Sequence, residues 1–351
     1  MVHTFNLRLK GGSSLTSPTQ LGFRMPAEWE PHIGTWLTWP RPQCISFPDI
    51  YERIPPVMAK MVRALSTGEK VFINVWDSEM EDEVRKQLEK KQALNDNVEF
   101  YHHQAYEPWC RDHGPIFVKN KNNRAIINWR YNAWGNKYPP YDLDNLIPEQ
   151  IAKTRGIECY DGEMVLEGGS IEVNGTGTLI TTESCLLNPN RNPQLSRHQI
   201  EDQLRKMLGV SNIIWLGEGI VGDDTDGHID DMTRFVDAHT VLTTVEENAQ
   251  DINYVPLKNN LKRLQKTDLN IVKLPMPEPV TFRDQRLPAS YANFYIGNSV
   301  VLLPTFQQPK DELAAKILGK AFPDREIAAI DSTDLIWGQG SFHCLTQQEP
   351  D

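Results

Sequence analysis

The sequence predicts an α/β protein built from repeated strand–strand–helix–strand units arranged around an axis, as in a propeller. Two observations carry this prediction. A pair of short strands joined by a turn recurs along the chain, and each pair is followed by a helical pattern and one more strand. Polar motifs rich in carboxylates lie directly before three of these hairpins. Loops in equivalent places on successive units would converge on one end of the axis and form a pocket there.

Four predicted hairpins define the repeat. Each is a run of alternating character on either side of turn-forming residues such as Asn174-Gly175. The hairpins span 116–130, 170–184, 233–245 and 291–306. Because their starts are 54 to 63 residues apart, each unit has room for a helix and a further strand. One ordinary doubly wound sheet is the alternative, since the repeats share no residue-level identity.

Each hairpin is followed by a predicted helix and a final strand. The clearest helix begins after Ser196, a capping residue type, and ends at Gly209. The other helical patterns span 145–154, 256–265 and 310–322. The final strands are expected at 157–160, 212–217, 270–275 and 326–331. A fifth unit is expected near the N-terminus, with a strand at 34–39, a helix near 51–66 and a strand at 70–76.

Length and hydropathy bound the class of protein. The chain has 351 residues and 39% apolar content, enough for a large core, and no linker-like stretch divides it. We therefore expect one domain over 23–351, preceded by a loose segment over 1–22 that includes a Gly- and Ser-rich stretch. The sequence has neither a signal peptide nor about 18 consecutive apolar residues, which predicts a cytoplasmic protein with no membrane partner.

Charge and cysteine content narrow the function. A net charge of -11 repels nucleic acid and attracts small cations, and solubility alone would also explain it. The five cysteines are odd in number and include no CxxC pair, which argues against a disulfide framework and a zinc ribbon. Three of them are interpreted as buried structural residues: Cys110, Cys159 and Cys185. Cys44 lies in a Pro-rich loop, and its role is left open.

Cys344 differs from the other cysteines because it lies in the Gly-flanked polar segment GQGSFHCLTQQ. Gly338 and Gly340 let backbone or substrate approach closely there. Most free cysteines are small buried residues rather than nucleophiles, so Cys344 taken alone decides nothing. Its surroundings nevertheless make it the candidate nucleophile.

The segment 222–231 holds five aspartates and His228. In an extended run, His228 and Asp230 point the same way, so the histidine could carry a proton while the carboxylate binds a cation beside it. A solvated acidic loop or a metal site is the alternative. Metal is disfavoured because His228 has no second histidine nearby, and His343 would diverge from Cys344 along a strand.

Two more carboxylates lie at turn-like junctions, Asp112 in WCRDHGP and Glu167 in LEGGS. Either one alone is more often half of a surface salt bridge. One thiol, one histidine and three carboxylates at such junctions suit a planar, cationic electrophile, because carboxylates match the N–H donors of a guanidinium.

Five motifs occur in order along the chain. They are FRMPAEWEPH at 23–32, EPWCRDHGP at 107–115, LEGGSIEVNGTGTLITTESCLLNPNRNP at 166–193, GDDTDGHIDD at 222–231 and GQGSFHCLTQQEP at 338–350. Together they resemble the agmatine deiminase family, which includes bacterial peptidylarginine deiminase-like proteins. The resemblance covers the chain from about residue 23 onward. It implies a single catalytic domain with a five-unit α/β propeller of ββαβ repeats, the fold of the guanidine-modifying superfamily.

The resemblance also implies a catalytic set, which is Cys344, His228, Glu167, Asp112 and Asp230. In this set Cys344 is the nucleophile and His228 the acid and base, while Asp112 and Asp230 clamp the guanidinium and Glu167 supports His228 or the substrate. Trp109 and Gly340 are implied as substrate-binding residues. The implied reaction converts agmatine to N-carbamoylputrescine and ammonia through a thiouronium on Cys344, in putrescine biosynthesis, with no metal or organic cofactor.

Several alternatives remain at this stage. A deiminase of free or peptide-linked arginine and an amidinotransferase would use similar residues, and a non-catalytic protein could bind a polyamine or guanidine. The expected partner is a small cationic guanidine, with no nucleic acid. Its distal amine has several candidate partners: Glu28, Trp29, Glu30, Asp223 and Asp224. The sequence leaves the oligomeric state open, with a homo-oligomer as one option.

Overall fold

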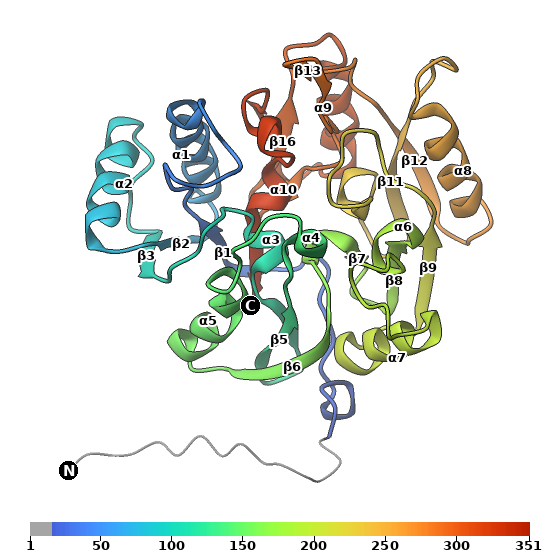
Figure 1. Cartoon of the computed structure of the whole chain (residues 1–351), viewed down its shortest axis with the longest axis horizontal. Coiled ribbons are helices and arrows are strands. Elements are labelled where there is room, and N and C mark those ends of the chain that lie inside the picture. The colour runs from blue at the N-terminus through green and yellow to red at the C-terminus, as the bar shows by residue number, and fades with distance from the viewer. Residues whose placement is uncertain (1–15) are drawn as a thin grey trace.

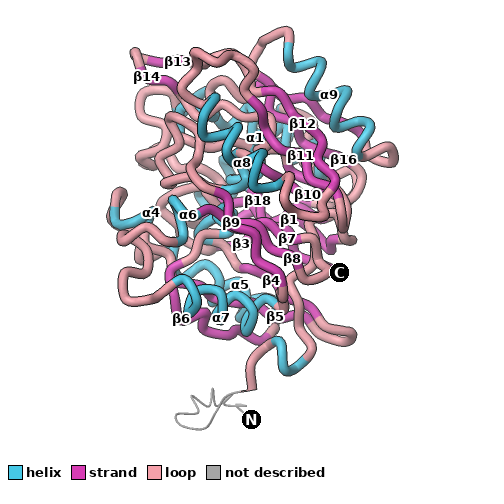
Figure 2. Tube along the Cα trace, turned by 90° about the vertical axis from the view of Figure 1, so that its right-hand side faces the viewer, coloured by secondary structure: helices cyan, strands magenta, loops and turns pink. Residues whose placement is uncertain are grey.

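Five small sheets with helices beside them make up most of the structure, a computed structural model that describes residues 16–351. Figure 1 shows these sheets following one another around the molecule in chain order. The side view in Figure 2 shows α8 (Tyr254–Leu264) next to β11 (Thr240–Val245) and β12 (Asn270–Pro275). Within the described residues the strands form separate sheets and no closed barrel. The fold is therefore mixed α/β as predicted, and a single doubly wound sheet is excluded.

Four sheets repeat the predicted order of hairpin, helix and parallel strand. In the first, β4 (Ile116–Lys119) pairs antiparallel with β5 (Arg124–Arg130), α5 (Ile147–Arg155) follows, and β6 (Glu158–Val165) lies parallel to β5. The next unit contains β7 (Ile171–Val173), β8 (Thr178–Thr182), α7 (Arg197–Leu208) and β9 (Asn212–Leu216). The third unit contains β10 (Thr233–Phe235), β11, α8 and β12. The fourth contains β15 (Tyr295–Ile296), β16 (Val300–Thr305), α9 (Lys310–Ala321) and β17 (Glu326–Asp331). The predicted hairpins and final strands are confirmed.

The remaining large sheet uses strands from distant parts of the chain. The predicted elements are present as β1 (His32–Thr38), α1 (Ile54–Leu65) and β2 (Lys70–Val75). The structure adds α2 (Ser78–Lys90) and β3 (Val98–His102), and it pairs β1 antiparallel with β18 (Thr346–Pro350). Because β18 directly follows Cys344, this pairing determines where the cysteine lies. A separate two-stranded ladder joins β13 (Thr281–Phe282) to β14 (Gln285–Arg286).

The helix α7 shows how local sequence sets the element boundaries. The Ser196 side chain accepts a hydrogen bond from the backbone N–H of Gln199, and the Gln199 side chain accepts one from the backbone N–H of Ser196. At the other end Gly209 has φ +70°, a left-handed conformation that suits glycine. Both predicted boundaries of this helix are therefore confirmed.

The described part of the N-terminal segment is attached to α7. Thr19 lies in a short 3-10 turn, and its hydroxyl donates hydrogen bonds of 2.8 Å to the carbonyl oxygens of Arg205 and Lys206. This stretch is therefore held in place rather than loose. Most of the predicted loose segment, residues 1–15, lies outside the described residues.

Apolar side chains fill the spaces between helices and strands, whereas buried charges join neighbouring units. One apolar cluster connects β1 and β2 with α1 and extends to Cys344, and another connects β4, β5, β7, β8 and α7. Four charged residues from different units are nonetheless almost completely buried: Glu28, Arg111, Glu172 and Arg234.

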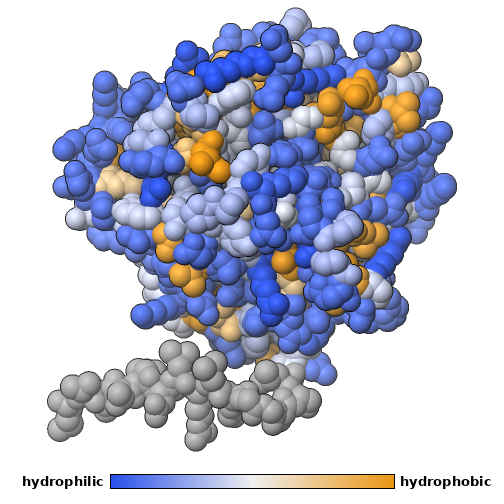
Figure 3. Space-filling model, viewed as in Figure 1, coloured by the Kyte–Doolittle hydropathy of each residue, from blue (hydrophilic) through white to orange (hydrophobic). Residues whose placement is uncertain are grey.

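None of the helices in the described residues has the length and apolar character of a membrane span. The face in Figure 3 is mostly hydrophilic, with separate small apolar patches.

Candidate active site

The candidate residues lie in or next to short turns that each precede the first strand of a hairpin or β18. These turns are α3 (Cys110–His113) before β4, η4 (Gly168–Ser170) before β7, η5 (Ile229–Asp231) before β10 and α10 (Phe342–Leu345) before β18. Contacts join α10 to α3, α3 to η4 and η4 to η5. Side chains that are far apart in the sequence therefore meet in one place, as the position of the motifs predicts.

The Cys344 thiol is buried beside Asp230 and Asn293. Its Sγ lies 3.6 Å from Asp230 Oδ2 and accepts a hydrogen bond of 3.1 Å from Asn293 Nδ2. The Asn293 Oδ1 accepts hydrogen bonds from the backbone N–H groups of His343 and Cys344 at 3.1 and 3.4 Å. Asn293 therefore holds both the turn and the sulfur atom in place.

Two carboxylates flank this thiol, and they differ in whether their oxygens have hydrogen-bond partners. Asp112 Oδ2 accepts a hydrogen bond from Trp134 Nε1, and Asp112 Oδ1 accepts one from the backbone N–H of Gly169, both at 3.0 Å. Asp230 Oδ2 lies 2.7 Å from His343 Nδ1, whereas Asp230 Oδ1 is buried without a hydrogen-bond partner. A buried carboxylate oxygen without a donor is a strong acceptor for an N–H group that enters the pocket.

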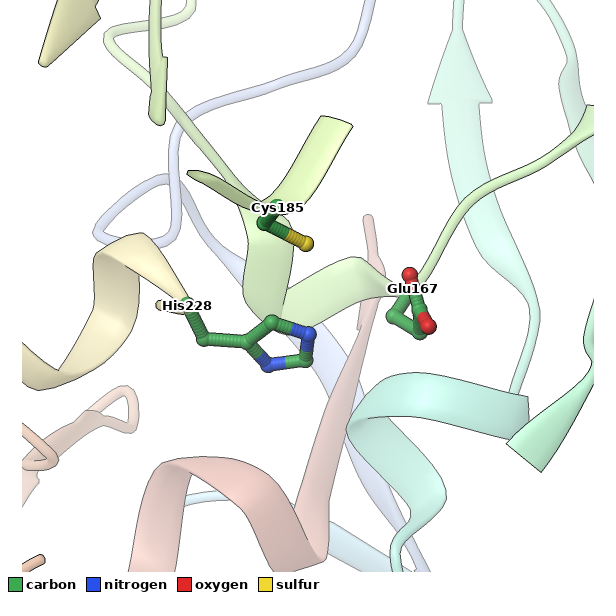
Figure 4. A group of neighbouring side chains, drawn as sticks. All are labelled: Glu167, Cys185 and His228. Atoms are coloured by element: carbon green, nitrogen blue, oxygen red, sulfur yellow. The ribbon is translucent and has the colours of Figure 1, made fainter. Parts of the chain in front are cut away.

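The side chains of His228, Cys185 and Glu167 point toward one another (Figure 4). The potential ligand atoms of these three side chains all lie within 4.8 Å of one another, and neither ring nitrogen of His228 has a hydrogen-bond partner. Glu167 Oε1 accepts a 2.6 Å hydrogen bond from Arg191 Nε, while Glu167 Oε2 has no partner. The imidazole is therefore free to exchange a proton with a bound molecule. The three residue types could also hold a metal ion, but the Arg191 guanidinium against Glu167 opposes a second cation there.

Burial and neighbouring charges shift the pKa values in this site. Burial raises the pKa of Asp112 to about 6, opposed by His228 and helped by nearby carboxylates. Burial lowers the pKa of His228, but Asp112, the contact with Cys185 and the charge of Asp230 together raise it well above its ordinary value. Burial, and then the charges of three aspartates, raises the pKa of the Cys344 thiol well above its usual range. These shifts favour the protonated forms of the imidazole and the thiol.

A cavity of about 180 Å³ gives access to Cys344 and Asp112. Its wall includes the aromatic side chains of Trp109, Trp134, Tyr138 and Trp337. Gly340 also lines it, and a Cβ atom there would lie 2.6 Å from the Trp109 ring and 3.1 Å from Cys344 Sγ. Glycine at this position therefore allows the indole to lie close to the thiol.

Comparison with known proteins places the chain in a family. A sequence model of the Porphyromonas-type peptidyl-arginine deiminase family matches residues 24–350. The chain belongs to this family. A protein of Selenomonas ruminantium with the name "Putative agmatine deiminase" is 38% identical over 95% of this chain and 98% of its own length.

Solved structures agree with this assignment to the deiminase family. The agmatine deiminase of Enterococcus faecalis has a TM-score of 0.90 and 31% identity, covering 97% of this chain and 99% of its own. A cysteine-to-serine variant of the C. jejuni agmatine deiminase with substrate bound has a TM-score of 0.87 and 32% identity, covering 94% and 96%.

In this member of the deiminase family, the structure brings all of the predicted site residues together. The predicted set is Cys344, His228, Glu167, Asp112, Asp230, Trp109 and Gly340. His343 departs from the sequence interpretation: α10 is a helical turn rather than a strand, and it places the His343 ring against Asp230 instead of away from the site. Cys185 is buried as expected, but it contacts the His228 environment, which the sequence did not indicate.

The structure reduces the set of residues that could bind the distal amine of the substrate. Glu28 is buried against Arg111 and Arg234, and Glu30 pairs with Arg24 at 2.6 Å, so neither faces the cavity. Trp29 packs against two apolar clusters, and Asp223 accepts hydrogen bonds from Thr225 and from the His228 backbone. Of the five candidates, Asp224 alone lines the cavity. Trp134 and Asn293 were missed because they lie outside the carboxylate-rich motifs.

Gly169 lies where three catalytic candidates converge, which yields a sharp prediction. A Cβ atom at this position would lie 2.6 Å from His228 Nδ1, 2.9 Å from Asp112 Oδ1 and 3.0 Å from Asp230 Oδ2. We expect Gly169→Ala to lower kcat/KM by about 100-fold, because displacement of reacting groups by about 1 Å has effects of this size. Steady-state kinetics of the purified variant would measure it.

The matched control is Gly319→Ala in α9, where the added Cβ meets only an ordinary contact of 3.8 Å with Ile327. This control should retain wild-type kinetics. Wild-type kcat/KM in Gly169→Ala would show that the site tolerates a displacement of these groups.

Proposed function

We propose that the chain is an agmatine deiminase that hydrolyses the guanidine group of agmatine to N-carbamoylputrescine and ammonia, a step in putrescine biosynthesis. The observation that carries the proposal is a thiol and a carboxylate that line one cavity of about 180 Å³, with an unpartnered imidazole 3.7 Å from the carboxylate and a second carboxylate 3.6 Å from the thiol. The relatives named as agmatine deiminases, with 31 to 38% identity over nearly their whole length, support the same reaction. The substrate-bound relative carries a cysteine replacement, which supports a cysteine-dependent turnover.

We further propose that the five sheets of three or four strands are the blades of an α/β propeller, which forms a single catalytic domain over 23–351. Their common order of antiparallel and parallel strands and their succession around the molecule in Figure 1 support this arrangement. The turns that carry the candidate catalytic residues then lie at one end of the pseudo-symmetry axis, where a single substrate can contact all of them.

Binding would place the guanidinium between Asp112 and Asp230. The unpartnered Asp230 Oδ1 accepts an N–H hydrogen bond, and the second carboxylate balances the charge from the other side. This orients the central carbon toward Cys344 Sγ. The bound cation also offsets the carboxylates that raise the thiol pKa, so that substrate binding itself favours the thiolate.

The chemistry would then proceed in two stages. The Cys344 thiolate adds to the guanidinium carbon, the protonated His228 gives its proton to a terminal nitrogen, and the C–N bond breaks to release ammonia and leave a thiouronium. Neutral His228 next removes a proton from water as the oxygen attacks the same carbon. The C–S bond breaks, the sulfur leaves as the thiolate, and the oxygen gives its remaining proton to the solvent, which completes the urea group of the product. Glu167, whose carboxylate lies within 4.8 Å of the imidazole, would stabilise its charged form.

The character of the cavity supports agmatine over arginine. Among the described residues that line it, Asp112 and Asp224 are the charged ones, and neither lysine nor arginine is present. Lys137, beside Asp224, is held by Asp226 Oδ1 at 2.9 Å. The α-carboxylate of arginine would therefore lose water without gaining a cationic partner, whereas an ammonium can lie against the aromatic wall.

The test is ammonia release from agmatine, free arginine and an arginine-containing peptide. We expect kcat/KM for agmatine to exceed that for either alternative, and that for free arginine by at least about 100-fold, because an unpaired buried carboxylate carries a penalty of that order. Preference for a peptide would instead assign the chain to peptidylarginine deimination. Binding of agmatine without turnover of any of the three would favour a non-catalytic guanidine-binding protein.

A further inference from the structure

His343, the residue directly before Cys344, bridges two buried carboxylates. Its Nδ1 lies 2.7 Å from Asp230 Oδ2, and its Nε2 lies 2.8 Å from Glu28 Oε2. The three side chains are at most 5% exposed. His343 does not line the cavity, and both of its ring nitrogens are occupied by Asp230 and Glu28, so it acts on the reaction through these two neighbours.

The contacts determine the charge of the His343 ring. Ionised carboxylates accept hydrogen bonds and cannot donate them, so an imidazole between two of them must donate from both nitrogens. An imidazole that donates from both nitrogens is an imidazolium. Glu28 is kept ionised because Arg234, His343 and Arg111 together outweigh its burial and hold its pKa well below the usual range. Asp230 is likewise held below its usual pKa, mainly by His343, despite its burial.

The other charged residues around Glu28 also favour a charged His343 ring. Arg234 Nη2 donates to Glu28 Oε1 at 2.8 Å and Arg234 Nε donates to Glu172 Oε2 at 2.9 Å, while Arg111 Nη2 lies 3.2 Å from Glu28 Oε2. With His343 charged, three cations face three carboxylates in this buried group. A neutral His343 would take one cationic partner away from both Asp230 and Glu28, which is unfavourable for buried carboxylates.

The bridge controls how Asp230 meets the substrate and the thiol. Because Oδ2 is tied to the imidazolium and also faces Cys344 Sγ at 3.6 Å, the carboxylate plane cannot turn, and Oδ1 remains without a partner. Glu28 fixes the ring from its other side and also accepts a hydrogen bond from the Ile296 backbone N–H at 2.8 Å. A rigid chain thus runs from Glu28 through His343 to Asp230 and Cys344.

We propose that His343 is a positioning residue that donates from both ring nitrogens and is anchored by Glu28, and that it holds Asp230 with one oxygen directed at the substrate guanidinium and the other at the nucleophile. The proposal rests on the proposed function, since it assigns the guanidinium to Asp230. It adds a second histidine to the site, with a role distinct from that of His228: both nitrogens of His343 are occupied by carboxylates, whereas those of His228 are without a partner.

The kinetic test compares His343→Gln, Glu28→Gln and the wild type. Glutamine at 343 removes the cation, so Asp230 can turn or take up a proton. We expect kcat/KM for agmatine to fall about 100-fold, chiefly through a higher KM, and Glu28→Gln, which keeps an acceptor for Nε2, to lose about tenfold, the range usual for residues that orient a catalytic group. The matched control is His103→Gln, another buried histidine, which contacts Asn74 and Thr154 and should keep wild-type kinetics.

A direct measurement of the protonation of the His343 ring tests the role of this residue independently of the proposed function. Protein labelled with ¹⁵N-histidine should give protonated-type signals for both ring nitrogens of one histidine at pH 7 to 8, and these signals should be absent from His343→Gln, with folding checked by circular dichroism. A neutral tautomer for His343, or unchanged KM and kcat in His343→Gln, would overturn the proposal. If the wild type released no ammonia from agmatine, the proposed function would fail while the NMR measurement still decided the state of His343.

Discussion

Replacing Cys344 with alanine is expected to lower ammonia release from agmatine by about 10⁴-fold or more, because no covalent intermediate can form without the thiol. Cys185 cannot substitute for it, since that thiol lies behind His228 and does not line the cavity. Binding should survive, because Asp112 and Asp230 remain. We therefore expect agmatine to bind the variant with a Kd within about tenfold of the wild-type KM, measured by calorimetry.

The control for this variant is Cys159→Ala, which removes a partly buried thiol on β6, away from the cavity. It should retain wild-type turnover. Near-normal ammonia release from Cys344→Ala would remove the cysteine mechanism altogether, whereas loss of turnover together with loss of binding would indicate that the alanine disturbs the fold of α10.

The repeating part of the fold could be predicted because its signals are local. A hairpin with turn residues such as Asn174-Gly175 and a helix bounded by Ser196 and Gly209 depend on neighbours within a few residues. The pairing of β1 with β18 depends on contacts between opposite ends of the described chain, such as Trp36 with Gln347. Local periodicity does not contain that information.

The distinction between local signals and long-range contacts also applies to the candidate active site. Asp112, Glu167 and Cys344 were visible because unusual polar residues stand beside glycines in short motifs. Asn293 and Trp134 have no such context, and only the folded chain brings them to the thiol and to Asp112. The role of the histidine next to Cys344 was misjudged because two residues that diverge on a strand lie on adjoining faces of a helical turn.

Replacing His228 with alanine is expected to lower kcat by about 10³- to 10⁴-fold, the upper range for loss of a general acid and base. The pH profile should also change shape. In the wild type, kcat/KM should fall as the pH drops through about 6, because Asp112 takes up a proton there and loses the charge that binds the guanidinium. It should fall again at high pH, where His228, whose pKa is raised well above its ordinary value, loses the proton it must donate.

In His228→Ala the loss of activity at high pH should disappear, while the loss near pH 6 remains, because Asp112 is still present. The exposed His198→Ala on α7 is the control and should keep both limbs of the profile. Intact-mass spectrometry of His228→Ala with agmatine should reveal a covalent adduct of agmatine minus ammonia if the water step depends on this imidazole more than the first step does. An unaltered pH profile would assign the proton transfers to another group. Glu167, whose carboxylate lies within 4.8 Å of the ring, would then be the residue to replace next.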